Sequence, residues 1–238
     1  MVSNPSTIDT SSWDGTLSSR DFCLAARAFS DIWKTSNPAM PQWSWVVPSP
    51  KLPLIAPHQV EGYLLLENVI LPRFSEEDHD EGSHTQKEEP SCSDQDEPID
   101  SAILVKSCGG ELHHYDFHIV YSTSYRVPVL YFRAYCSDGQ PLVLDDFEKD
   151  LPANSVKAIT ESKWTFITQE EHPYLNRPWY TLHPCGTSEW IKLLLTAEAS
   201  MAKGACAIEK YLVSWFSVVG QVIGLRLPFE MLSDNAQL

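Results

Sequence analysis

A cysteine occupies a setting that suits a nucleophile in the run His183-Pro184-Cys185-Gly186-Thr187. Pro184 fixes its own φ and disfavours the helical region for His183, so the chain reaches Cys185 in a stiff, extended form. Gly186 carries no side chain and leaves room for another chain to come close. Once deprotonated, such a thiol is a nucleophile that can form a covalent acyl intermediate.

The alternative for Cys185 is a packing role, because free cysteine is among the residue types most often buried. Helical periodicity starts directly after it, which places the thiol at a strand-to-helix junction. If Thr187 or Ser188 caps that helix, Cys185 lies just ahead of a helix N-terminus, whose partial positive charge favours the thiolate.

Two nearby histidines raise the alternative of a cysteine hydrolase. His172 or His183 would then act as the base for Cys185. No papain-like or caspase-like signature surrounds the cysteine, which weighs against this class.

A second group of ligand-type residues consists of Cys108, His113, His114 and His118. Two of the histidines, His113 and His114, point to opposite faces of a strand, and no fourth ligand is evident. The six cysteines are scattered and contain no CxxC pair, so reduced thiols are expected rather than a zinc site or a disulfide scaffold. We expect no metal ion and no other cofactor.

The elements that must position Cys185 follow from periodicity. Residues 16–34 have apolar positions at helical spacing, after the candidate caps Thr16 and Ser18. A strand is predicted at residues 62–71, and residues 43–47 are predicted to form a strand or an extended packing segment.

A β-hairpin is predicted where aromatic and β-branched residues are dense. Its strands are residues 112–121 and 127–135. Alternation places one face, with Tyr115 and Phe117, against the core and leaves the other face half-exposed. Helices are predicted at residues 187–209 and 211–223.

Residues 74–100 differ in kind, because they hold 11 acidic residues and almost nothing apolar. Such a segment buries too little apolar surface to offset the entropy lost on ordering, so we expect a disordered acidic insertion in a single domain that spans residues 1–238. The alternative is an acidic recognition segment.

Charge and hydropathy argue against nucleic-acid binding and against a membrane-spanning helix. A net charge of -15, without a cluster of Lys or Arg, argues against nucleic acid. The most apolar stretch, residues 211–225, is shorter than the roughly 20 residues of a transmembrane helix. The N-terminus lacks the pattern of a secretory signal, so a cytoplasmic location is expected.

Two segments carry a resemblance to a known family. Residues 121–134 form part of the hairpin, and residues 171–185 contain His172-Pro173-Tyr174 and end at Cys185. Together they are similar to the autophagy ubiquitin-like-conjugating enzymes, the autophagy-related protein ten family. The similarity runs from the first helix to about Lys192 and skips the acidic insertion.

This resemblance implies an α+β fold of the ubiquitin-conjugating type, an antiparallel sheet flanked by helices. It also implies that Cys185 carries a thioester. The autophagy activating enzyme would pass the modifier Atg twelve to Cys185, which would transfer it to a lysine of Atg five and so support autophagosome formation. The aromatic hairpin is expected to offer an edge or a face for docking the acceptor.

The sequence departs from ordinary ubiquitin-conjugating enzymes at one position. Those enzymes place an Asn directly after His-Pro, where this chain has Tyr174. The candidates for stabilising the oxyanion in its place are Asn176, His183 and Tyr125. A non-catalytic binding module of the same fold, or a cysteine hydrolase, remains the alternative function.

Overall fold

The computed structural model describes residues 7–8, 13–48, 62–71, 112–151, 167–202 and 206–232. Its centre is an antiparallel sheet with the strand order β2-β3-β4-β5-β7-β6. The strands of this sheet are β2 (Ser44–Val46), β3 (Tyr63–Ile70), β4 (His114–Ser122), β5 (Val127–Tyr135), β6 (Ile167–Glu171) and β7 (Pro178–Leu182). The predicted α+β fold with an antiparallel sheet is confirmed.

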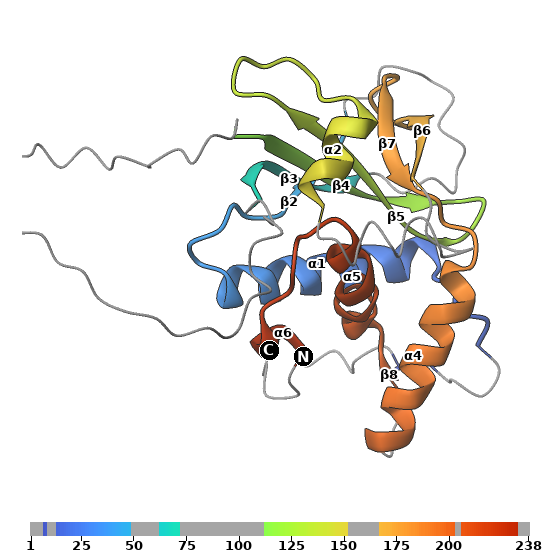
Figure 1. Ribbon diagram of the computed structural model, residues 1–238. Coiled ribbons are helices and arrows are strands. Elements are labelled where there is room, and N and C mark those ends of the chain that lie inside the picture. The colour runs from blue at the N-terminus through green and yellow to red at the C-terminus, as the bar shows by residue number, and fades with distance from the viewer. Residues whose placement is uncertain are drawn as a thin grey trace, which may run out of the picture.

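The helices complete the fold, and α1 and α5 lie under one face of the sheet (Figure 1). Their bounds are α1 (Ser19–Ser36), α2 (Leu144–Asp150), α4 (Thr187–Ala202), α5 (Tyr211–Val222) and α6 (Phe229–Leu232), with a short 3-10 helix η2 (Ile208–Lys210). A separate two-stranded sheet pairs β1 (Thr7–Ile8) with β8 (Cys206–Ala207). In the part of the chain that the structure describes, no helix is long and apolar enough to span a bilayer.

Helix α1 begins where one of the two predicted caps stands. The Ser18 hydroxyl oxygen accepts the backbone N–H of Asp21 at 3.1 Å, and the same hydroxyl donates to the Asp21 carboxylate at 2.6 Å. This reciprocal arrangement satisfies an N–H group that has no partner inside the helix. Of the two candidate caps, Ser18 is confirmed, and the helix begins at Ser19.

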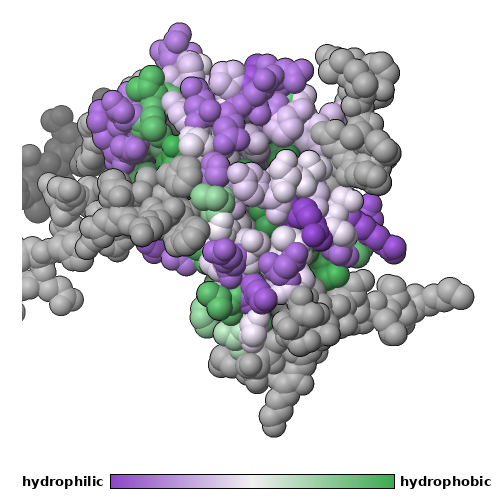
Figure 2. Space-filling view, turned by 90° about the vertical axis from the view of Figure 1, so that its right-hand side faces the viewer, coloured by the Kyte–Doolittle hydropathy of each residue, from purple (hydrophilic) through white to green (hydrophobic). Residues whose placement is uncertain are grey.

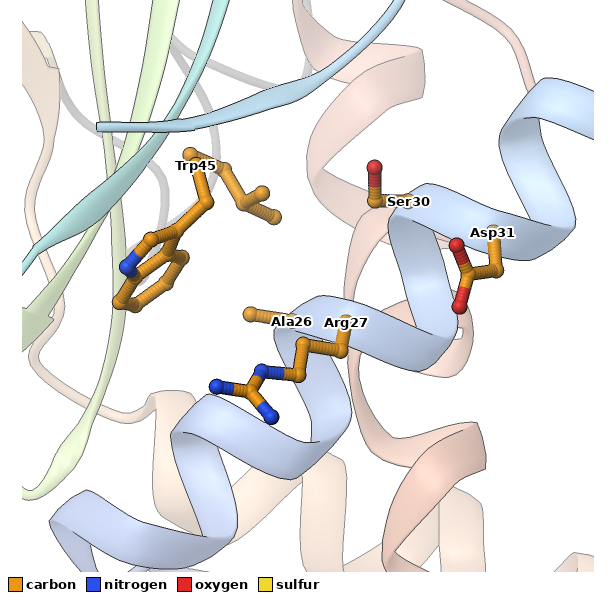
Figure 3. Close-up of a pocket in the computed structure, with 6 residues that line it drawn as sticks. Ala26, Arg27, Ser30, Asp31 and Trp45 are labelled. Atoms are coloured by element: carbon orange, nitrogen blue, oxygen red, sulfur yellow. The ribbon is translucent and has the colours of Figure 1, made fainter.

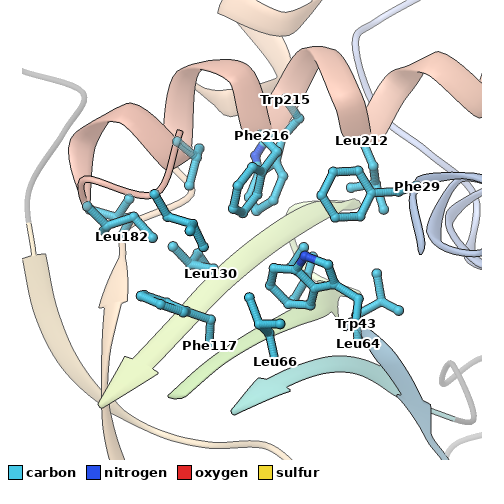
Figure 4. Packing of buried hydrophobic residues seen from close by; sticks show 14 of the residues in the cluster. Phe29, Trp43, Leu64, Leu66, Phe117, Leu130, Leu182, Leu212, Trp215 and Phe216 are labelled. Atoms are coloured by element: carbon cyan, nitrogen blue, oxygen red, sulfur yellow. The ribbon is translucent and has the colours of Figure 1, made fainter. Parts of the chain in front are cut away.

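The main core lies between the sheet and helices α1 and α5. Phe216 of α5 is fully buried, with its ring centroid 5.3 Å from that of Phe29 and 5.8 Å from that of Trp43. Leu64, Leu66, Phe117, Leu130 and Leu182 from the strands form the opposite side of this packing (Figure 4). The core thus holds β7 and α5 in fixed positions on either side of the segment that contains Cys185.

The predicted hairpin is confirmed as β4 and β5, but the expectation of a free edge was wrong. Half of its outer face is buried, because His118 and Val120 are only 3% and 1% exposed, whereas His114 and Asp116 are partly exposed. A second aromatic cluster, formed with Tyr63, Tyr131 and Trp179, covers the buried half. Both strands lie inside the sheet, since β4 pairs with β3 and β5 pairs with β7. The hairpin therefore has no free edge on β4.

The C-terminal half differs from the prediction in two places. The helix predicted at residues 187–209 ends at Ala202, and a new helix begins at Tyr211. Helix α2 was not predicted. It is held on the sheet by Phe147, whose ring centroid lies 4.7 Å from that of Phe132. The acidic segment 74–100 and Cys108 lie outside the described residues.

Candidate active site

Cys185 lies in the connection between β7 and α4. The end of β7 lies beside the start of β5, because the two strands pair in an antiparallel ladder. The register pairs Tyr131 with Thr181 in the antiparallel ladder of β5 and β7. Continuing this register brings the start of β5, and the β4–β5 turn before it, next to residues 183–185. Cys185 is a free cysteine and is partly exposed.

The connection is a tight turn that ends in a helix. Gly186 has a φ of 81°, and the Thr187 N–H donates to the Pro184 carbonyl at 3.0 Å. The Gly186 carbonyl accepts the N–H of Trp190 at 3.1 Å, so Gly186 holds the N-cap position that we predicted for Thr187 or Ser188. The prediction that Cys185 lies just ahead of a helix N-terminus is confirmed.

Two of the three predicted supporting residues lie beside this turn. The Nδ1 atom of His183 accepts the backbone N–H of Cys185 at 3.1 Å. The ring of His183 contacts Tyr125 edge-on, with the ring centroids 5.7 Å apart. Tyr125 lies in the β4–β5 turn and is 46% exposed.

The third predicted support, Asn176, lies elsewhere. It occupies the β6–β7 turn with a φ of 51°, and its N–H donates to the His172 carbonyl at 3.0 Å. The five residues of β7 separate that turn from Cys185, which corresponds to roughly 16 Å of extended chain. The structure therefore does not bring Asn176 together with Cys185.

His172 is likewise remote from the cysteine and belongs to the outer face of the sheet. Its Nε2 atom is 2.9 Å from Nδ1 of His118, and its Nδ1 atom accepts the backbone N–H of Tyr174 at 3.2 Å. Burial lowers the pKa of His118 to about 3 and that of His172 to about 4. The charges of Arg133 and Arg177 contribute to both of these lowered pKa values, and that of His172 contributes to the pKa of His118. This neutral pair does not supply a base for Cys185.

Residues 13–17 were missed by the sequence analysis. The Leu17 N–H donates to the Arg126 carbonyl at 2.8 Å, and Gly15 lies against the backbone of Ser188. The segment thus reaches both the β4–β5 turn and the first turn of α4. Gly15 was a local signal for a turn, but nothing in the sequence indicated these long-range contacts.

The space beside Cys185 is small and open. A hollow of about 40 Å³ borders the site. It is lined by Pro128, Leu182, His183, Thr187, Trp190, Trp215, Val218, Val219 and Val222. Pockets for drug-sized ligands measure about 300 to 1,000 Å³, so this hollow does not suit a small-molecule substrate.

The side of the molecule that carries the β7–α4 connection is shown in Figure 2. Polar side chains cover most of the described part of this face, and apolar ones form separate patches. A larger hollow of about 280 Å³ lies between α1 and β2 (Figure 3). Arg27 and Trp45 stand on its two sides, and β3, β4 and β5 separate β2 from β7.

The residues that the structure describes contain no arrangement of side chains suited to binding a metal ion. There, no group of three or more His, Cys, Asp or Glu residues is placed to hold an ion. His113 pairs with the carboxylate of Asp150, and His118 pairs with His172.

Comparisons with known proteins agree on one family. The family model described as "Autophagocytosis associated protein, active-site domain" matches residues 21–230. The ubiquitin-like-conjugating enzyme ATG10 of Arabidopsis thaliana is 54% identical over 223 residues, which cover 92% of this chain and 96% of the relative. The ubiquitin-like-conjugating enzyme ATG10 of Homo sapiens is 37% identical over 141 residues, or 59% of this chain and 62% of the relative.

More distant matches include autophagy-related protein 3 of Pichia angusta, which is 30% identical over 52% of this chain and 35% of the relative. Among solved structures, the crystal structure of the autophagic E2 Atg10 aligns with a TM-score of 0.46 and 16% identity, over 89% of this chain and 99% of that chain. The family match and the Arabidopsis relative each span most of the chain, so the protein belongs to the autophagocytosis-associated family of ubiquitin-like-conjugating enzymes.

Proposed function

We propose that the protein accepts the modifier Atg twelve from the autophagy activating enzyme as a thioester on Cys185 and transfers it to a lysine of Atg five in the cytoplasm. The observation that carries the proposal is the position of Cys185, in a tight turn just ahead of α4 and beside His183. The conjugating role in autophagy follows from the family. The identities of the modifier and the acceptor rest on the resemblance of residues 121–134 and 171–185.

The proposed reaction consists of two successive acyl transfers. In the first, the Cys185 thiolate attacks the thioester carbonyl that links the modifier to the activating enzyme, and the thiolate of that enzyme leaves. In the second, the neutral amine of the acceptor lysine attacks the carbonyl on Cys185. The C–N bond forms, the C–S bond breaks with its electron pair left on the Cys185 sulfur, and the proton of the amine passes to that thiolate or to solvent water. A thioester needs no charge relay for this step, because its thiolate leaves readily.

The rate then depends on how the reacting groups are positioned and on how the negative charge of the tetrahedral intermediate is stabilised. The tetrahedral intermediate places negative charge on the former carbonyl oxygen, and one lost oxyanion donor typically costs about 100-fold to 1,000-fold in rate. We propose the Tyr125 hydroxyl and the Nε2–H of His183 as donors. Both residues lie beside the Cys185 turn, and Nδ1 of His183 is already an acceptor, which leaves the proton of the neutral ring on Nε2.

The geometry favours this reaction over cysteine hydrolysis. A hydrolase would need a histidine nitrogen available to take the proton of the thiol. Nδ1 of His183 is engaged by the Cys185 backbone, and His172 is buried with His118.

Acceptor docking is proposed for the β4–β5 turn rather than for a sheet edge. Arg126 in this turn is 55% exposed, and Asp14 lies 3.6 Å away. Arg133 is less suitable for a test, because it donates to the Pro178 carbonyl and lies 5.0 Å from the ring of Trp179. We expect Arg126→Glu to weaken capture of the acceptor in a pull-down, and unchanged capture would remove the support for this surface.

The deciding experiment is a thioester assay. The protein is incubated with the activating enzyme, ATP and the modifier, and the products are separated on reducing and non-reducing gels. We expect a thiol-sensitive adduct for the wild type, a reductant-resistant ester or no adduct for Cys185→Ser, and a normal adduct for the control Cys136→Ser.

Other outcomes would favour the alternatives. An adduct on Cys185→Ala would place the carrier cysteine elsewhere. Absence of any adduct from the folded wild type would favour a non-catalytic binding module. Turnover of a small acyl ester without the activating enzyme would favour a hydrolase.

A further inference from the structure

We propose that residues 13–17, here called the strap, are a positioning element for Cys185. The inference rests on the proposed function, because it concerns the transfer of an acyl group from this cysteine. The strap precedes α1 in the sequence and contacts two elements that flank the Cys185 turn, namely the β4–β5 turn and the start of α4.

The first contact joins the strap to the β4–β5 turn. The Leu17 N–H donates to the Arg126 carbonyl at 2.8 Å, and the Leu17 carbonyl accepts the buried Tyr121 hydroxyl at 2.7 Å. Arg126 has a φ of 56°, a conformation that costs energy for a side chain of its size. Since Tyr125 precedes Arg126 and touches His183, the strap helps to fix the position of the Tyr125 ring.

The second contact joins the strap to α4. Gly15 has a φ of 84°, and a Cβ atom added to it would lie 1.8 Å from the carbonyl oxygen of Ser188. The Gly15 carbonyl accepts the buried hydroxyl of Tyr211 at 2.9 Å. The position therefore requires glycine for two reasons, its φ and its approach to a backbone only three residues after Cys185.

The strap is stiffened by its own hydrogen bonds. The indole N–H of Trp13 donates to the Thr16 carbonyl at 2.7 Å, and the Asp14 carboxylate accepts the Thr16 N–H at 3.0 Å and its hydroxyl at 2.6 Å. Trp13 also packs edge-on against Tyr211, with the centroids 5.9 Å apart. These bonds let the segment act as a fixed spacer between Arg126 and Ser188.

A displaced strap should alter the distance between Tyr125 and Cys185 without any change in either residue. Acyl transfer is sensitive to such changes, because a misplacement of about 1 Å can cost roughly 100-fold in rate. The expected defect lies in discharge of the thioester to an amine. Recognition of the activating enzyme, which precedes it, should be spared.

The test compares Gly15→Ala with Gly139→Ala. Gly139 has a φ of 85°, but a Cβ atom there meets nothing within 4 Å. Both variants therefore carry the same backbone strain, and only Gly15→Ala pushes against Ser188. The charged proteins are isolated and their discharge to free lysine is followed in single turnover, over a range of lysine concentrations.

We expect Gly15→Ala to lower the rate constant at saturating lysine by roughly 10-fold to 100-fold, and Gly139→Ala to match the wild type. Loss of folded protein alone would reduce the amount of thioester but not this rate constant. Equal rate constants for the two variants would overturn the inference.

A second pair of variants covers the case in which Gly15→Ala does not fold. Tyr211→Phe removes the hydroxyl that bonds Gly15 and keeps the ring against Trp13. Its control is Tyr115→Phe, which removes a buried hydroxyl bonded to Asp150 near the opposite end of β4. Slower discharge for Tyr211→Phe alone supports the strap, and equal discharge for both overturns it. If the wild type forms no thioester, the proposed function itself fails.

Discussion

The imidazole of His183 and the backbone of Cys185 are joined by a hydrogen bond of 3.1 Å, in which Nδ1 accepts the cysteine N–H. An acceptor nitrogen must be unprotonated, so the bond fixes the tautomer with its proton on Nε2. It holds the turn around Pro184 through a side chain, in addition to the backbone hydrogen bond from the Thr187 N–H to the Pro184 carbonyl. His183 therefore determines both the shape of the turn and the direction in which its own proton can be donated.

Replacement of His183 should separate these contributions. We expect His183→Phe to slow discharge of the Cys185 thioester by at least about 100-fold, because it removes the proposed Nε2–H donor as well as the hydrogen bond that holds the turn. His183→Asn keeps a short acceptor near the Cys185 N–H and should recover part of the rate. Single-turnover discharge of the two isolated thioesters provides the measurement. Identical rates for His183→Phe and the wild type would contradict the role of this bond.

Gly186 offers a second test of the same turn. Its φ of 81° lies in the left-handed region, so we expect Gly186→Ala to reduce the free energy of unfolding by about 1 to 2 kcal/mol. Asn tolerates this region better than Ala, and Gly186→Asn should lose less stability. Urea unfolding of the three proteins provides the comparison. Equal losses for Ala and Asn would mean that crowding of the added side chain, and not φ, determines the cost.

The sequence was sufficient to place Cys185 and two of its neighbours. Pro184, Gly186 and the helical periodicity after them defined the turn locally. Tyr125 was within reach of prediction because the hairpin strands have a strong alternating pattern, and a hairpin turn lies at a definite end of its strands. These features depend on short-range rules, and the structure agrees with them.

Long-range packing limited the rest of the prediction. Asn176 is close to Cys185 in sequence, but an extended strand carries the two residues apart. His172 is equally close in sequence, and its partner His118 comes from another strand 54 positions away. The contact of Gly15 with Ser188 joins residues that are 173 positions apart in the sequence. No local pattern reports such pairs, because each depends on how the sheet and helices assemble.

The core between the sheet and α5 should be sensitive to truncation. Phe216 is fully buried among the rings of Phe29, Trp33 and Trp43. We expect Phe216→Ala to lower the free energy of unfolding by about 3 to 5 kcal/mol through lost contacts and a cavity. Phe229 is 79% exposed, and Phe229→Ala should change it by less than about 0.5 kcal/mol. Equal losses in urea unfolding would argue against the packing of α5 described above.

The buried pair of His118 and His172 should make stability depend on pH. Burial lowers both pKa values, to about 3 and about 4, so the unfolded chain binds protons before the folded protein does. The contribution of the neutral pair is complete above about pH 7 and declines as the pH falls through 6.5 toward 4. At pH 5 the loss amounts to about 2 kcal/mol for each histidine.

Urea unfolding of the wild type and of His118→Phe, measured between about pH 7 and pH 5, tests this sign. The variant should show a shallower decline, because one of the two groups no longer takes up a proton on unfolding. Phe216→Leu is the matched control, since it weakens the core but leaves the pair intact and should shift the curve without altering its slope. Parallel curves for His118→Phe and the wild type would mean that His118 gains its proton within the folded protein. The NMR signals of the ring Cε1–H would then move over the same range of pH.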